Sequence, residues 1–330
     1  MIADGRVMEE RGRLIRDGAV ALVLSMVFYS LGVVSFLYVV PVMLFALKGG
    51  RRKAELLLSV VSFIVLALEV FHMRGADAGK ERFAYLLISL YFPLSLSAAG
   101  IVWLETEHDH RLLRRLVSAL VPSIVFLFVI TVFIYTDRAL LDSLMGDYEN
   151  ALAQLMGDLL GQLLPGLEMS VLAELVLMTV LSMLVPFLLA SICASCFIYC
   201  CGRHSRESEW EWSVMTFEYP PNVVWGLIVS WALVLLLHFV SVPAALIVAV
   251  MNLALSFCVL YGIEGFSVVM ARLRRKNGKV RSMTVFTVLF IASIALPGIN
   301  LIIILGLPLL GVLESFFDLK KIGAEYENHS

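Results

Sequence analysis

Apolar runs long enough to cross a lipid bilayer are the feature that most constrains this sequence. A transmembrane helix needs about 20 apolar residues to cross roughly 30 Å of hydrocarbon. Hydrophobic residues make up 60% of the 330 residues and charged residues 16%, against about 45–50% and about 25% in soluble domains. The sequence therefore predicts an all-α, polytopic transmembrane helical bundle that forms a single integral membrane domain over residues 1–330. Its eight apolar runs are 19–47, 54–72, 83–104, 116–136, 171–200, 222–239, 244–271 and 283–313.

The first and last runs are longer than one crossing requires. They contain 29 and 31 residues, which is about 44 and 46 Å of straight helix at roughly 1.5 Å per residue. YSLG at 29–32 interrupts the first run and LPGIN at 296–300 interrupts the last. Proline and glycine interrupt membrane helices where protein or water shelters the freed backbone groups. We therefore expect runs 19–47 and 283–313 to be broken hairpins, either re-entrant or double-spanning.

The distribution of lysine and arginine decides the topology, because cytoplasmic loops are enriched in both. Eight single spans would divide the 25 basic residues 10 to 15 across the membrane, whereas hairpins at both ends divide them 21 to 4. The stronger bias predicts that the N-terminal segment 1–18, the basic turn at 48–53 and the C-terminal tail 314–330 are cytoplasmic. The predicted location is the bacterial cytoplasmic (inner) membrane, with several passes.

A segment with a polar face separates the fourth and fifth runs. Within residues 137–166, apolar residues recur at spacings of three and four from Leu140 to Leu164, and Pro165-Gly166 ends the pattern. This periodicity predicts an extracytoplasmic amphipathic helix. Its polar face is acidic, unlike the basic faces that attract anionic lipid. Two interpretations remain open: a helix packed on its own bundle, and a lid or partner-docking helix.

Polar residues within apolar runs are the candidates for function, because such groups are costly in hydrocarbon. Glu264 lies about 10 Å from the basic end of its run, and we assign it to coupling or packing. Asn252, Asn300, Glu69 and His72 fall toward the outer ends of their runs and are the candidate ligand-binding residues. Interhelical hydrogen bonding is the competing interpretation for the asparagines, and an interfacial position is the competing one for the other two.

The cysteines and the missing motifs limit the chemistry. Cys193, Cys196, Cys200 and His204 lie along one helical stripe that is too long to hold one metal ion, so we interpret the cysteines as packing groups. GADAGKE at 75–81 lacks the spacing and the hydroxyl residue of a phosphate-binding loop. The sequence predicts no catalytic residue, no metal, no cofactor, no enzyme activity and no nucleic-acid partner.

Three C-terminal stretches carry a family resemblance. They are FEYPPNVVWGLIVSWAL at 217–233, NLALSFCVLYGIEGFSVVMARLRRK at 252–276 and ILGLPLLGVLESFFDLKK at 304–321. On these stretches the chain resembles the YybS-like family of bacterial polytopic membrane proteins, whose function is not established. Gly265 matches a glycine of the family pattern, and Glu314 stands where an aspartate is usual. The family is distantly similar to the substrate-binding (S) components of energy-coupling-factor transporters.

The resemblance implies a component that binds a small solute in the membrane and depends on separate energising subunits. We therefore expect a small-solute binding or transport component that lacks its own ATPase. Its partners would be the lipid bilayer, a small-molecule solute and the energising subunits. The alternative is a non-transporting membrane scaffold or regulatory protein that uses the acidic outer helix. A membrane-embedded enzyme would need Glu264 or the cysteine stripe to carry its chemistry.

Overall fold

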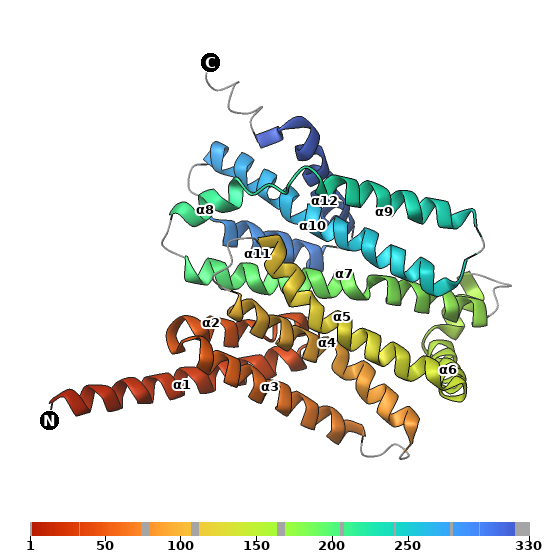
Figure 1. Ribbon diagram of the computed structural model, residues 1–330, viewed down its shortest axis with the longest axis horizontal. Coiled ribbons are helices and arrows are strands. Elements are labelled where there is room, and N and C mark those ends of the chain that lie inside the picture. The colour runs from red at the N-terminus through yellow and green to blue at the C-terminus, as the bar shows by residue number, and fades with distance from the viewer. Residues whose placement is uncertain are drawn as a thin grey trace. The chain divides into compact units, whose positions relative to one another are not determined.

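The computed structural model describes residues 2–32, 34–73, 79–106, 112–163, 169–204, 208–240, 242–277, 280–296 and 298–320. Over these ranges the regular secondary structure is helical and contains no strand, so the predicted all-α class is confirmed (Figure 1). The chain divides into two compact units, which are described separately. Unit 1 comprises residues 1–178 and 188–199, and unit 2 comprises residues 179–187 and 200–330.

Six of the described helices are long and apolar enough to cross a membrane, which makes the chain a multi-span membrane protein. Six of the eight predicted runs contain one of these helices, whereas the runs 19–47 and 222–239 contain only shorter apolar helical segments. The spanning-length helices are α3 (Arg51–His72), α4 (Lys80–Glu105), α5 (Leu112–Thr136), α7 (Met169–Arg203), α10 (Ala244–Asn277) and α12 (Ile299–Phe317). The shorter ones are α2 (Val40–Gly49), α9 (Val223–His238) and α11 (Ser282–Ala295).

Helices end at both predicted interruptions. The helix α1 (Ile2–Ser30) ends within YSLG, and the short turn η1 (Ser35–Leu37) leads into α2, which packs against α1. At the other interruption α11 ends and α12 begins after Gly298. Gly32 and Gly298 have φ angles of +54° and +90°, a conformation that glycine adopts without steric cost. The glycines therefore explain why the helices stop there, and the membrane depth of each hairpin stays a prediction.

Unit 1 is organised around α4, which packs against α3 and α5. Pro93 lies inside α4 and removes one backbone donor from its hydrogen-bond ladder. Tyr38, which is 1% exposed, donates its hydroxyl to the Pro93 carbonyl and lies 2.5 Å from Ser97 Oγ. On the α5 side, the Arg115 guanidinium lies 3.8 Å from the centre of the Trp103 ring. Polar contacts therefore hold α4 beside Pro93 and near its C-terminal end.

The segment with a polar face forms α6 (Arg138–Leu163). Asp137 caps its N-terminus, because its Oδ1 accepts the backbone N–H of Leu140 at 3.3 Å. Leu140 is buried, and Leu152 packs against Leu172 and Ala173. Two residues of the apolar pattern of α6, Leu140 and Leu152, are therefore buried. Side chains 155–166 lie outside the described residues, and the extracytoplasmic amphipathic character of the segment stays a prediction.

Unit 2 is organised around α10, which packs against α8 (Ser208–Met215), α9 and α12. Gly265 and Gly311 form the crossing of α10 and α12. A Cβ atom at Gly265 would overlap the carbonyl oxygen of Leu307, and one at Gly311 would overlap the carbonyl oxygen of Tyr261. The two backbones are therefore in direct contact, which only glycine permits.

The turns at the two ends of α3 test the predicted topology. In a background without the five native cysteines, Gly79→Cys should react with an impermeant thiol reagent added outside the cell, and Arg52→Cys should not. Arg52 is preferred to Gly50 because Gly50 has φ +84°, where a cysteine would be strained. Labelling in the reverse pattern would overturn the 21 to 4 assignment of basic residues.

Candidate functional site

Glu264 is a buried acid in a helix of membrane-spanning length. The residue is 2% exposed, and the backbone N–H of Tyr219 hydrogen-bonds to its carboxylate. Its Oε2 atom is buried and has no hydrogen-bond partner among the described residues. Burying a polar atom without a partner costs free energy, and the cost is larger for a charged group. Other groups around Glu264 must therefore offset the cost of burying this unpaired oxygen.

Glu314 of α12 is the second buried acid and holds the chain that follows the helix. The residue is 4% exposed. Asp318 has φ +43°, a left-handed conformation that ends α12 and turns the backbone. The backbone N–H of Lys320 then donates to Glu314, at 3.1 Å from Oε2 and 3.4 Å from Oε1. Glu314 therefore fixes the position of Lys320.

Lys320 supplies a buried positive charge beside these acids. Its Nζ donates to the carbonyl of Phe217 at 2.6 Å and lies 3.8 Å from Oε1 of Glu314. Burial lowers the pKa of the Lys320 ammonium, while the charges of Glu314, Glu218 and Glu264 oppose that shift. Arg275 of α10 donates to the Lys320 carbonyl. The segment after α12 is thus fastened to α10, α12 and the segment before α9.

The non-helical segment 217–220 covers the cluster. Its Phe217 carbonyl also accepts a hydrogen bond from Ser267 Oγ at 3.2 Å, which ties the segment to α10. Glu218 Oε1 lies 4.0 Å from Lys320 Nζ, and the Glu218 side chain is 51% exposed. Glu218 is therefore the member of the cluster that meets water.

The charges in this cluster do not cancel. Lys320, Glu314 and Glu218 all interact electrostatically with Glu264. Because Glu218 is half exposed, water screens its charge. The buried part then has two carboxylates and one ammonium. Ionisable groups at membrane depth are costly and typically mark ion or proton pathways. The arrangement can therefore take up one further positive charge.

Unit 1 has a separate open cleft where α3 ends and α4 begins. Its volume is about 450 Å³, which lies within the range of roughly 300–1,000 Å³ typical of small-molecule sites. The cleft combines an imidazole, a guanidinium and two hydroxyl groups with apolar side chains. The hydroxyl groups of Tyr85 and Ser89 already donate to Asp147 and to the Leu86 carbonyl. The cleft is lined by His72, Met73, Arg82, Tyr85, Ile88 and Ser89.

Polar contacts tie α6 to the start of α4 beside this cleft. Tyr85, a lining residue, donates its hydroxyl to Asp147 of α6 at 2.8 Å. Lys80 donates to the N-cap residue Asp137 at 2.5 Å. The pKa of Asp137 lies below its usual value, chiefly because of this hydrogen bond from Lys80. The acidic face of α6 is therefore partly used to hold the helix near the cleft.

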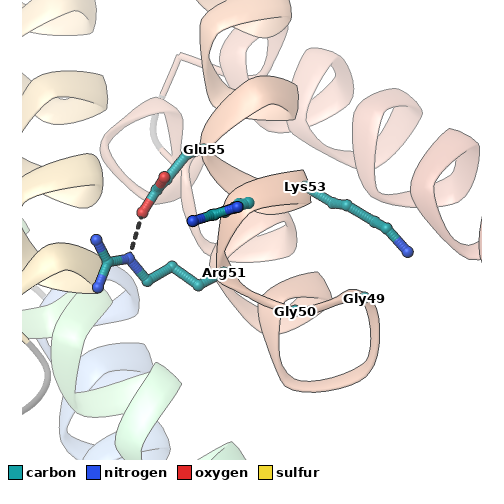
Figure 2. Close-up of a pocket in the computed structure, with 6 residues that line it drawn as sticks. Gly49, Gly50, Arg51, Lys53 and Glu55 are labelled. Carbon is teal, nitrogen blue, oxygen red and sulfur yellow. Dashed lines mark hydrogen bonds and ion pairs between the residues drawn. The ribbon is translucent and has the colours of Figure 1, made fainter.

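A second pocket, of about 470 Å³, lies at the basic turn between α2 and α3 and is lined by residues 49–53 and Glu55. Figure 2 shows Arg51 beside Glu55, to which its Nε donates at 2.6 Å, while Lys53 extends away. Arg51 also donates to the carbonyl of Glu105 at 3.4 Å. Arg51 therefore links the start of α3 to the end of α4.

Asn252 binds the backbone of α7 within unit 2. Its Nδ2 donates to the Leu181 carbonyl at 2.8 Å, and its Oδ1 accepts the Val185 N–H at 3.0 Å. In an unbroken α-helix the backbone N–H of Val185 donates to the carbonyl of Leu181. Pro186 follows directly and has no N–H of its own to donate. Asn252 therefore inserts its amide into the α7 ladder, as the interhelical interpretation of this residue requires.

The other predicted ligand-binding residues have different surroundings. Asn300 is exposed, and its Oδ1 accepts the backbone N–H groups of Gly298 and Leu301 at 3.1 and 2.7 Å, so it binds backbone at the start of α12. Glu69 accepts the hydroxyl of Tyr29. His72 lines the α3–α4 cleft. The structure thus places one of the four in a pocket, and ligand binding by any of them stays a prediction.

Sequence reasoning missed Lys320 as a member of the Glu264 site. It lies among exposed-looking residues of the C-terminal tail, and its burial depends on the turn at Asp318. No disulfide links the five cysteines. Among the described residues, no three His, Cys, Asp or Glu side chains are placed so that they could hold a metal ion.

No family model, no curated protein and no solved structure matches this chain. The helices define its class as a multi-span helical membrane protein. The resemblance to the YybS-like family, and any function that it implies, therefore belongs with the proposals below.

The glycine crossing beside Glu264 can be tested with a matched pair of variants. Gly265→Ala should lower the melting temperature in detergent, because its Cβ would overlap backbone atoms of α12, and such overpacking costs about 1–3 kcal/mol. Gly262→Ala is the control on the same helix, since its Cβ would lie 3.8 Å from Pro308 in ordinary contact. Equal melting temperatures for the two variants would contradict the direct contact of the backbones.

Proposed function

We propose that this protein binds a small solute in the membrane and transports it as a component that lacks its own ATPase. The observation that carries the proposal is the buried Glu264, which is 2% exposed in a spanning-length helix and has one oxygen without a partner. An ion gradient or separate energising subunits would supply the free energy. This agrees with the resemblance to the YybS-like family and, through it, to transporter S components.

The cost of burying charge favours a coupling role for Glu264 over a packing role. Replacing a buried ion pair by well-packed apolar residues of similar volume often leaves the stability of a protein unchanged, or raises it by about 1–4 kcal/mol. The hydrogen bonds of Glu314 and Lys320 fasten neighbouring segments, whereas packing alone gives no reason for the additional acid Glu264 beside them. The half-exposed Glu218 gives the cluster a contact with water, through which an ion can enter and leave.

The α3–α4 cleft is the proposed solute site. It is large enough for a small molecule and presents the imidazole of His72 beside apolar surface. The amides of Asn252 and Asn300 already bind backbone groups. The proposal therefore assigns the first ligand contact to His72. In this scheme α6, which is tied to Tyr85 through Asp147, acts as a lid.

The alternative is a non-transporting membrane scaffold or regulatory protein. The exposed acidic positions Asp142 and Asp147 on α6 favour it, because they offer a surface for a basic partner. In this case Glu264 would serve packing alone, and the cleft would hold no solute. The two functions therefore predict opposite results in a ligand screen.

A ligand screen with two histidine variants tests the proposed function. Native mass spectrometry of the purified full chain should detect a retained small molecule, or a metabolite library should contain a compound that raises its melting temperature. His72→Ala should lose that stabilisation, and His238→Ala, at the end of α9 and outside the cleft, should keep it. No retained ligand together with no stabilising compound would favour the scaffold.

A further inference from the structure

We infer that the Glu264, Glu314 and Lys320 cluster holds one exchangeable proton on Glu264, which makes the proton the coupling ion of this protein. The coupling part of the inference rests on the proposed function. The proton-binding part rests on the charge, burial and hydrogen bonding of the cluster alone.

The charge balance of the buried groups calls for one added positive charge. Glu264, Glu314 and Lys320 are 2%, 4% and 7% exposed, so two negative charges face one positive charge away from water. An uncompensated charge at low dielectric is far more costly than a protonated acid, and a buried carboxyl group therefore takes up a proton. Neutralising Lys320 instead would leave both negative charges uncompensated.

Hydrogen bonding assigns the proton to Glu264 rather than to Glu314. Both oxygens of Glu314 accept the backbone N–H of Lys320, and Oε1 also lies 3.8 Å from the Lys320 ammonium. These donors stabilise the charged form of Glu314. Glu264 Oε2 has no donor among the described residues. A proton on that atom removes the unpaired charge without breaking an existing hydrogen bond.

The ligand set suits a proton better than a metal ion. Hard cations take about six or more oxygen ligands. The oxygens of Glu314 and the carbonyl of Phe217 already accept from Lys320. The Lys320 ammonium would also repel a cation bound at this position. A proton needs only the free oxygen of Glu264.

Proton exchange requires contact with water and is affected by the charged groups around the cluster. On binding, a hydronium ion gives its proton to the Glu264 carboxylate and becomes a water molecule. Proton release reverses this step. Glu218, with its side chain 51% exposed, provides the acceptor nearest to solvent. The titratable and charged groups near the cluster include Glu264, Tyr261, Arg274 and Arg275 of α10, Glu314 of α12, Asp318 and Lys320 after it, and Glu218 and Tyr219 of the 217–220 segment. Arg275 is exposed, so water screens its charge as it does that of Glu218.

Infrared spectroscopy of the full-length protein in detergent detects the proton directly. At neutral pH the wild type should show the carbonyl-stretch band of one protonated carboxylic acid per chain, and the band should shrink as the pH rises. Glu264→Gln should lose it, because one carboxylate and one ammonium then balance. Lys320→Met should double it, because two buried acids then lack a positive partner. Glu218→Gln is the control and should keep the wild-type band.

Three results would overturn the inference. The first is no protonated acid in the wild type at neutral pH. The second is a band that survives Glu264→Gln and disappears in Glu314→Gln. The third is stabilisation by Na⁺, K⁺ or Ca²⁺ chlorides over choline chloride that Glu264→Gln abolishes, which would replace the proton by a metal cation. A band that behaves as expected in a chain without any solute ligand would support the proton site and refute the transport function.

Discussion

Direct backbone contact between α10 and α12 at Gly265 and Gly311 is the constraint on which the rest of unit 2 depends. A side chain at either glycine would overlap a carbonyl group of the other helix. The contact brings Glu264, next to the first glycine, into electrostatic range of Glu314, three residues after the second. Once these acids are together, the turn at Asp318 and the lysine that follows it become part of the same buried network. The glycines thus determine which charges meet.

This network has features that cost stability. It contains more negative than positive charge, leaves one carboxylate oxygen unpaired, and touches water through one half-exposed glutamate. Asn252 provides a contrast within the same unit. Its donor and acceptor groups both bind the α7 backbone near Pro186, so its polar atoms are satisfied where they lie. Asn252 thus completes hydrogen bonds of the α7 backbone, whereas Glu264 has an oxygen that can accept a proton.

Much of the architecture could be predicted from the sequence, because membrane-length apolar runs and chain-breaking glycines act locally. The helical class and the ends of α1 and α11 follow from such patterns. The count of eight runs exceeds the six spanning-length helices, because Val223–His238 is too short and the apolar part of 19–47 is divided by η1. The partners of Glu264 were not predictable, since its electrostatic interaction with Lys320 depends on two non-local events. These are the helix crossing and the turn at Asp318. The hydrogen bonds of Asn252 likewise depend on α7, a helix distant in sequence.

The central claim is that the charge of Glu264 serves ion binding and not the stability of the fold. The most direct test is the thermal unfolding of Glu264→Gln, measured against the wild type in the same detergent. A melting temperature equal to or above that of the wild type is expected, because the amide keeps an acceptor for the Tyr219 N–H and removes an uncompensated buried charge. A melting temperature several degrees lower, with the variant still folded at low temperature, would show that the charge of Glu264 is structural and would contradict the account.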